Sequence, residues 1–267
     1  MNSERPNGRR LGPRLQEGGG GVLLLIDPDR HEISSIRRRA EHASKAGVAA
    51  ILIGSSFLES DRFNEAVRVC RVSADLPVVL FPGSGSQLSS YADGILFLSL
   101  ISGRNPELLI GEHVRSAHRI KRMKLEVLPT GYMLVESGTM TAVQFMSNTI
   151  PLPRNKPELA AAHALAGQLL GLGLIYMDAG SGARHSIHPE FTQRVAQTID
   201  IPLLVGGGLK TPEAVAAQIG HGARMVVVGT AVESASESSG LLAEMVAAAK
   251  SSGSAIDHSI VCHRGAQ

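Results

Sequence analysis

Acidic, hydroxyl and glycine residues follow the short apolar runs of this 267-residue chain, where a folded protein could place its chemistry. Asp27 and Asp29 come directly after the first run, and Gly54-Ser55-Ser56 follows the second. Mg²⁺ prefers a few carboxylate oxygens together with water and a ligand's phosphate, so Asp27 with a serine hydroxyl predicts a magnesium site. Asp29 has another interpretation, because aspartate commonly caps a helix that begins just after it.

Glycines follow two later apolar runs, as Gly206-Gly207-Gly208 and then Gly229-Thr230. Glycine lets backbone N–H groups converge on an oxyanion, and the last two loops of a parallel barrel commonly hold a phosphate. Either segment alone would also suit a tight turn. Together they predict a site for a phosphate monoester.

The segment Tyr176–Gly182 places an acid and a serine among glycines, at the end of another apolar run. We expect Asp178 to point into the same region and Ser181 to add a donor to the phosphate. The alternative interpretation is a solvated acid before a turn. The position of the segment next to the glycine loops favours a role in substrate binding.

Eight short apolar runs alternate with segments of helical periodicity. The runs are Val22–Ile26, Ala49–Ile53, Pro77–Phe81, Gly94–Leu98, Leu125–Leu128, Leu174–Met177, Pro202–Val205 and Met225–Val228. Continuous apolar runs are typical of strands buried on both faces of a parallel sheet. Eight strands joined by helices favour one (β/α)8 barrel over residues 21–250, with a doubly wound sheet as the alternative.

Two connections depart from this regularity. Only a dozen residues separate the third and fourth runs between Phe81 and Gly94, and Gly83 and Gly85 disfavour a helix there. We therefore expect the third helix of the barrel to be missing or reduced. Met133–Asn155 is long and poor in helical periodicity, which is typical of a functional or mobile loop, and we expect its Ser147–Asn155 part to cross an edge of the barrel mouth.

Composition excludes several classes of protein. Lys and Arg number 26 against 24 Asp and Glu, and Trp is absent, so there is little support for a nucleic-acid binder. Two distant cysteines, Cys70 and Cys262, indicate free thiols and a cytoplasmic location. No secretory signal or membrane-spanning stretch is visible. We expect no fixed structure in residues 1–20 and a C-terminal tail at 251–267.

Several long segments resemble, in the same order, those of the geranylgeranylglyceryl phosphate synthase family, in the branch that archaea and bacteria share. They are LIDPDR (Leu25–Arg30), LPTGYMLVESG (Leu128–Gly138), SNTIPLPRNKPELAAAHALAGQLLG (Ser147–Gly171), IYMDAGSGA (Ile175–Ala183), LLVGGGLKTPE (Leu203–Glu213) and VVVGT (Val226–Thr230). The resemblance implies a modified TIM barrel without its third helix. It also implies a Mg²⁺-dependent prenyltransferase that moves a geranylgeranyl group from its diphosphate to the C3 hydroxyl of sn-glycerol 1-phosphate, forming an ether-lipid precursor.

The resemblance assigns residues as well. It implies Asp27 and Ser56 at the magnesium site, and Asp178 as the group that takes the hydroxyl proton, where the family usually has Glu. The glycerol phosphate contacts that it implies are Tyr176, Met177, Asp178, Ala179, Gly180, Ser181, Gly182, Gly207, Gly208, Gly229 and Thr230.

The prenyl tail needs an apolar groove, for which the gap at the missing helix near Leu96, Leu98 and Leu100 is our candidate. We further expect a homo-oligomer that contacts a membrane transiently when product leaves. Two other functions stay open. One is a phosphate-binding barrel of the sugar-phosphate isomerase or epimerase type, and the other is a non-catalytic protein that binds isoprenoids or glycerol phosphate.

Overall fold

The computed structural model describes residues 9–17, 19–234 and 240–264, with side chains for all of these except 234 and 254–264. Eight parallel strands close into one barrel in chain order, and β1 pairs with both β2 and β8. The strands are β1 (Gly21–Ile26), β2 (Ala50–Ile53), β3 (Val78–Leu80), β4 (Gly94–Leu100), β5 (Glu126–Leu134), β6 (Leu174–Asp178), β7 (Leu203–Gly206) and β8 (Met225–Val228). The expected (β/α)8 barrel is confirmed, and a doubly wound sheet is excluded because the sheet closes on itself.

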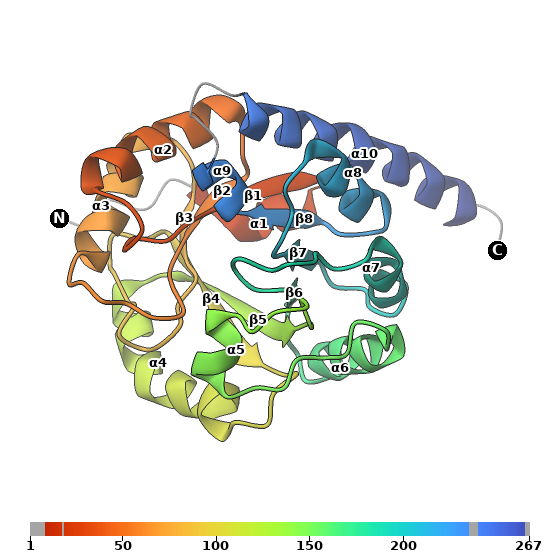
Figure 1. Cartoon of the computed structure of the whole chain (residues 1–267), viewed down its shortest axis with the longest axis horizontal. Coiled ribbons are helices and arrows are strands. Elements are labelled where there is room, and N and C mark those ends of the chain that lie inside the picture. The colour runs from red at the N-terminus through yellow and green to blue at the C-terminus, as the bar shows by residue number, and fades with distance from the viewer. Residues whose placement is uncertain (1–8, 18, 235–239, 265–267) are drawn as a thin grey trace.

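Helices form a ring around the barrel (Figure 1). The ring consists of α2 (Ile33–Ala46), α3 (Phe63–Ser73), α4 (Glu112–Met123), α6 (Pro157–Leu169), α7 (Pro189–Ala196), α8 (Pro212–Gly220) and α10 (Leu241–Arg264). A single π-helical turn, η2 (Glu107–Gly111), leads into α4. In the segment expected to form a C-terminal tail from residue 251, α10 continues as far as Arg264, and residues 265–267 lie outside the described chain.

The apolar residues of the strands fall into two layers. One set, including Leu23, Leu96 and Leu204, fills the inside of the barrel. The other, including Ile51 and Val205, packs against the helices. Burial on both faces is why the strands read as continuous apolar runs.

The connection from β3 to β4 contains no helix, as expected, and loop occupies that part of the ring in Figure 1. Its backbone lies against the loop that follows β2. A Cβ on Gly54 would stand 1.8 Å from the carbonyl oxygen of Phe81, and one on Gly83 would stand 2.3 Å from that of Ser55. No side chain fits at either position, so these glycines allow the two loops to touch.

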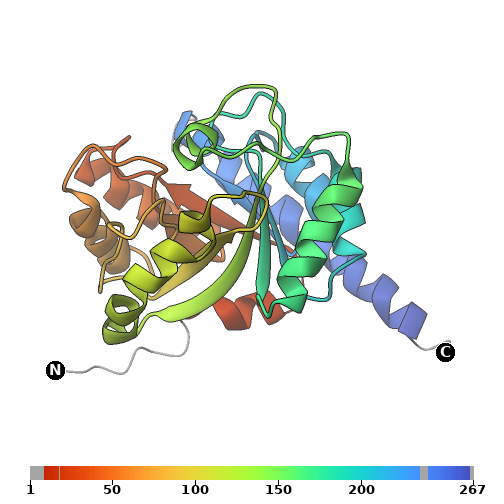
Figure 2. The same ribbon diagram turned by 90° about the horizontal axis from the view of Figure 1, so that it is seen from below.

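The region after β5 differs from the expectation in one respect. We expected the fifth strand to end at Leu128, but β5 continues to Leu134 and pairs with β4 as far as Leu100. Pro129 and Gly131 interrupt the apolar run without ending the strand. The long connection that follows carries the short helix α5 (Ala142–Ser147), which lies at the opposite end of the barrel from α1 (Leu11–Gln16) in Figure 2.

The N-terminal segment is ordered where the structure describes it, which corrects the expectation for part of residues 1–20. The helix α1 closes the amino-terminal end of the barrel with Leu11 and Leu15, which are both buried. Glu126 at the start of β5 accepts hydrogen bonds from the backbone N–H groups of Leu11, at 2.8 Å, and Gly12, at 3.2 Å. The sequence does not predict this helix, because Leu11 and Leu15 stand among glycine and arginine residues without a clear helical period. Residues 1–8 and 18 lie outside the described chain.

Two further expectations concern cysteines and membranes. Cys70 is a buried free thiol whose pKa burial raises to about 12, so it stays protonated and unreactive. The side chain of Cys262 lies outside the described residues. In the part of the chain that the structure describes, none of the helices combines the length and apolar character needed to cross a bilayer.

The closure of the barrel by α1 leads to a prediction about stability. Leu11→Ala should lower the free energy of unfolding by about 2–5 kcal/mol, because it leaves a cavity in a fully buried position. Leu170→Ala is the matched control, since Leu170 is 80% exposed, and it should change stability by less than about 0.5 kcal/mol. Urea denaturation measures both. Equal effects of the two changes would show that α1 does not seal the barrel.

Candidate active site

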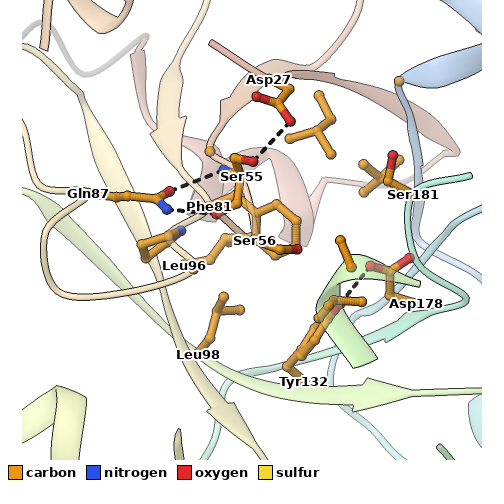
Figure 3. A pocket seen from close by; sticks show the side chains of 18 of the residues that line it. Asp27, Ser55, Ser56, Phe81, Gln87, Leu96, Leu98, Tyr132, Asp178 and Ser181 are labelled. Atoms are coloured by element: carbon orange, nitrogen blue, oxygen red, sulfur yellow. Dashed lines mark hydrogen bonds between the residues drawn. The ribbon is translucent and has the colours of Figure 1, made fainter. Parts of the chain in front are cut away.

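A cavity of about 790 Å³ opens at the carboxyl ends of the strands, the end of a parallel barrel where active sites lie. One part is bounded by the glycine loops after β7 and β8 and by Asp178 at the end of β6. The other part passes beside β4 and reaches Ile120 of α4. Figure 3 shows this cavity, with Asp27 and Ser55 on one side and Asp178 and Tyr132 on another.

Asp178 is held by two hydrogen bonds in a buried position. The hydroxyl of Tyr132 donates to Oδ2 at 2.6 Å, and the backbone N–H of Gly180 donates to Oδ1 at 2.8 Å. Burial raises the pKa of Asp178, and the two hydrogen bonds oppose part of that rise. A carboxylate with a raised pKa accepts a proton more readily than an exposed one, so Asp178 is suited to act as a general base.

Three aromatic rings support this carboxylate from inside the barrel. The ring centroids of Phe81, Tyr132 and Tyr176 lie 5.4–5.9 Å apart, with edges directed at faces or tilted. β5 and β6 place Tyr132 and Tyr176 in register, and both are buried. The ring of Tyr132 is therefore fixed, and its hydroxyl has one orientation toward Asp178.

The glycine loops have the geometry that an anion needs. Gly207 and Gly208 have φ angles of +83° and +72°, a left-handed pair that glycine adopts without strain. Successive N–H groups in such a turn can point at one oxyanion. The hydroxyls of Ser181 and Thr230 lie 3.2 Å apart and join the loops after β6 and β8. Backbone and hydroxyl donors thus converge at one end of the cavity.

Asp27 lies at the rim, across the cavity from Asp178 (Figure 3). Its Oδ2 accepts a hydrogen bond from the hydroxyl of Ser55 at 3.0 Å and lies 3.5 Å from Nε of Arg30. Arg30 also lies 3.4 Å from Glu233 of the short helix α9 (Thr230–Ser234). Burial raises the pKa of Asp27, so a bound cation would relieve an unfavourable environment for its charge.

The capping interpretation of Asp29 is wrong. Helix α2 begins after Glu32 without a side-chain cap. Asp29 instead accepts hydrogen bonds from the backbone N–H of Glu59, at 2.6 Å, and from the hydroxyl of Ser60. It therefore joins the loop after β1 to the loop after β2, which keeps Asp27 and the serine pair together.

The part of the cavity beside β4 is lined by leucines of that strand, although α4 also contributes Glu112, His113 and Ser116 to the cavity. Leu96, Leu98 and Leu100 line it, as expected for the groove, together with Leu108 of η2 and Ile120 of α4. A helix after β3 would occupy this space in a regular barrel. Because a loop replaces it, the cavity extends out of the barrel mouth toward α4.

The structure brings most of the expected site residues to one cavity. Those that line it are Asp27, Ser56, Tyr176, Asp178, Ser181, Gly182, Gly207, Gly208, Gly229 and Thr230. Met177 and Ala179 belong instead to the layer between strands and helices, because alternate residues of a strand face opposite ways. Gly180 does not line the cavity either, but its N–H orients Asp178.

Two residues at the site, Tyr132 and Gln87, had no role in our sequence analysis. Tyr132 belongs to a segment that carried the family resemblance. It stands two residues before Leu134, a spacing that places both side chains on the same face of a strand, and this was the available signal that Tyr132 points inward. Ser55, and not Ser56, makes the hydrogen bond to Asp27. Gln87 is buried and bonds both backbone groups of Ser55, accepting from its N–H at 3.1 Å and donating to its carbonyl at 2.7 Å. No local pattern marks Gln87.

Known proteins resemble this chain over most of its length. The model of the PcrB family matches residues 16–249. The geranylgeranylglyceryl phosphate synthase of Chitinophaga pinensis is 44% identical over 220 residues, covering 82% of this chain and 87% of the relative. The enzyme of the same name from Pyrococcus abyssi is 42% identical over 225 residues, covering 84% and 88%.

A solved structure extends the similarity to three dimensions. The crystal structure of (S)-3-O-geranylgeranylglyceryl phosphate synthase from Thermoplasma acidophilum, in complex with sn-glycerol-1-phosphate, has a TM-score of 0.85 and 33% sequence identity. The alignment covers 90% of this chain and 97% of that chain. With nearly the whole barrel matched in sequence and in fold, the chain belongs to the PcrB family.

Proposed function

We propose that this protein transfers a geranylgeranyl or similar prenyl group from its diphosphate to the C3 hydroxyl of sn-glycerol 1-phosphate and releases diphosphate. One observation carries the proposal. A single cavity joins a glycine-lined end beside a buried carboxylate to an apolar channel along β4. The first part suits a small phosphorylated alcohol and the second suits a long hydrocarbon, and the two substrates would meet where the parts join.

The acceptor would bind at the glycine end. Its phosphate would take hydrogen bonds from the Gly207-Gly208 backbone and from the hydroxyls of Ser181 and Thr230, which is where backbone and side-chain donors converge. Its hydroxyl would then lie near Asp178 at the end of β6. Holding the hydroxyl beside a base and opposite the prenyl donor would accelerate the reaction, because the reacting groups no longer have to find each other in solution.

The prenyl donor would place its tail along β4. The leucines there and Ile120 offer only apolar surface, and burying the tail contributes about 0.8 kcal/mol per CH₂. The diphosphate would lie at the rim near Asp27 and Arg30. Departure of the leaving group places negative charge on its oxygens, so cationic groups at that point favour the reaction.

The charges that line the cavity favour a magnesium ion at its rim. Its lining includes four carboxylates, from Asp27, Glu112, Asp178 and Glu233, but only two permanent cations, from Arg30 and Lys210. Two phosphorylated substrates would add further negative charge. Among the described residues no three acidic, histidine or cysteine side chains gather into a protein-only metal site, so Asp27 would share the ion with phosphate and water, as Mg²⁺ prefers. When bound, Mg²⁺ would neutralise charge on the departing diphosphate.

The two other functions explain less of the structure. A sugar-phosphate isomerase or epimerase would use the glycine loops but would have no use for an apolar channel beside β4. A non-catalytic binding protein would have no need for a buried carboxylate with a raised pKa next to the phosphate loops.

The experiment that tests the function supplies sn-glycerol 1-phosphate, Mg²⁺ and prenyl diphosphates of several lengths, and identifies the products by mass spectrometry. We expect the prenyl ether of the glycerol phosphate together with free diphosphate. sn-Glycerol 3-phosphate is the control for the acceptor. Turnover of a phosphorylated ketose without prenyl diphosphate would instead support an isomerase, and tight binding without product would support a binding protein.

A second prediction concerns the metal. Asp27→Asn should lower turnover at least about 100-fold, because the group that anchors the cation loses its charge. Binding gives an independent readout. Mg²⁺ with inorganic diphosphate should raise the melting temperature of the unmodified protein and of Asp61→Asn, an exposed control, but not that of Asp27→Asn. An equal rise in all three proteins would exclude Asp27 as a magnesium ligand.

A third prediction concerns the phosphate site. Ser181→Ala and Thr230→Ala should each raise the KM for sn-glycerol 1-phosphate about tenfold, which corresponds to about 1.4 kcal/mol, while the KM for prenyl diphosphate stays unchanged. Thr198→Ala removes a hydroxyl that lies just after α7, donates to the carbonyl of Arg194 and does not line the cavity, and it should change neither constant. If the KM for prenyl diphosphate rose instead, these hydroxyls would belong to the donor's site.

A further inference from the structure

The carboxylate of Asp178 is enclosed on one side by backbone. Oδ1 accepts the N–H of Gly180 at 2.8 Å, and Gly207 approaches so closely that a Cβ there would lie 2.8 Å from this oxygen. The same added atom would stand 2.7 Å from the backbone nitrogens of Ala179 and Gly180. An alcohol bound in the cavity cannot enter between these groups, so the backbone side of Oδ1 is closed to it.

The other oxygen is covered by Tyr132. Its hydroxyl donates to Oδ2 at 2.6 Å, and the tyrosine itself lines the cavity. Aspartate is too short to extend past this hydroxyl. Figure 3 shows the side chain of Tyr132 directed at Asp178, with the bond between them at the cavity. A substrate hydroxyl would therefore contact the oxygen of Tyr132 and not the carboxylate.

We propose that Tyr132 is a catalytic residue that relays the proton of the acceptor hydroxyl to Asp178. The inference rests on the proposed function. As the bond between the prenyl carbon and the diphosphate oxygen breaks, diphosphate leaves with the electron pair and the C3 oxygen bonds to that carbon. The C3 hydroxyl proton passes to the oxygen of Tyr132, and the Tyr132 proton passes to Oδ2 of Asp178. Tyr132 ends neutral, and Asp178 ends as the carboxylic acid.

The surroundings of the pair suit this transfer. Burial and the charge of Asp178 raise the pKa of Tyr132 well above its usual value, so the phenol keeps its proton until the acceptor supplies another. Tyr176 is equally buried but has no hydrogen bond to Asp178, and its hydroxyl faces Gly206. Tyr132 is thus distinguished from its neighbour by contact with the base.

The test combines the loss of the relay with a longer carboxylate that does not need it. Tyr132→Phe removes the relay and should lower the single-turnover rate at least 100-fold, with the KM for sn-glycerol 1-phosphate changed less than twofold. Asp178→Glu alone should retain activity, because the family usually has Glu at this position and the longer side chain can reach the substrate directly. The double variant Y132F/D178E should recover at least tenfold over Y132F, since the longer carboxylate fills the vacated space and reaches the substrate directly.

Tyr91→Phe is the matched control, because Tyr91 is exposed and does not line the cavity, and it should keep the full rate. The solvent isotope effect gives a second readout. The rate is measured in mixtures of H₂O and D₂O. A plot of rate against deuterium content should be curved for the unmodified protein, where two protons move, and linear for the double variant, where one proton moves.

The outcomes separate this inference from the function beneath it. If the unmodified protein forms no prenyl ether, the proposed function itself is wrong. If it forms the ether and Tyr132→Phe keeps the rate, Asp178 acts without a relay. If Tyr132→Phe is folded but slow and Asp178→Glu restores nothing, Tyr132 only holds the base in place, and the relay is excluded.

Discussion

The contact between two loop backbones is the constraint on which the catalytic end depends. Gly54 lies against the carbonyl of Phe81 and Gly83 against that of Ser55, at distances that exclude any side chain. Because the loops touch, Gln87 of the connection after β3 reaches the backbone of Ser55. Ser55 is thereby held on Asp27. The same arrangement leaves the space beside β4 free of helix, so one contact both orders the proposed metal corner and opens the apolar channel.

Burial of Asp178 is the second constraint on the catalytic end. It opposes folding, but it favours the chemistry. An acid inside a barrel is unfavourable unless its oxygens are hydrogen-bonded, and here Tyr132 and Gly180 supply those bonds. The remaining rise in its pKa makes the carboxylate a stronger base. The rings of Phe81 and Tyr176 pack against Tyr132, so the groups that stabilise the acid also define how a substrate can approach it.

The fold was largely predictable from the sequence, because strands buried on both faces leave continuous apolar runs and the short Phe81–Gly94 connection cannot hold a helix. The errors have physical causes. β5 passes through Pro129 and Gly131 because pairing with β4 outweighs local preference, and α1 forms because the open end of the barrel buries Leu11 and Leu15. Asp27, Asp178 and the glycines were predictable as strand-end residues. Gln87 and the Ser55 contact depend on loops meeting in space, which no spacing encodes. The expected self-association, membrane contact and cytoplasmic location stay predictions.

The distribution of charge within the cavity explains why the two substrates need different means of binding. Burial lowers the pKa of His113, so this histidine adds no charge near neutrality, and the charge of Glu112 on the same helix is paired with Arg115. The acceptor phosphate would lie where neutral backbone and hydroxyl donors converge, and such donors bind it without placing a fixed cation beside Asp178. A cation there would lower the pKa of that carboxylate and weaken it as a base. The diphosphate, which must leave as an anion, would lie at the rim near Arg30 and Asp27. Separating the charged donors from the base therefore allows one cavity to stabilise a leaving anion and to keep a strong proton acceptor.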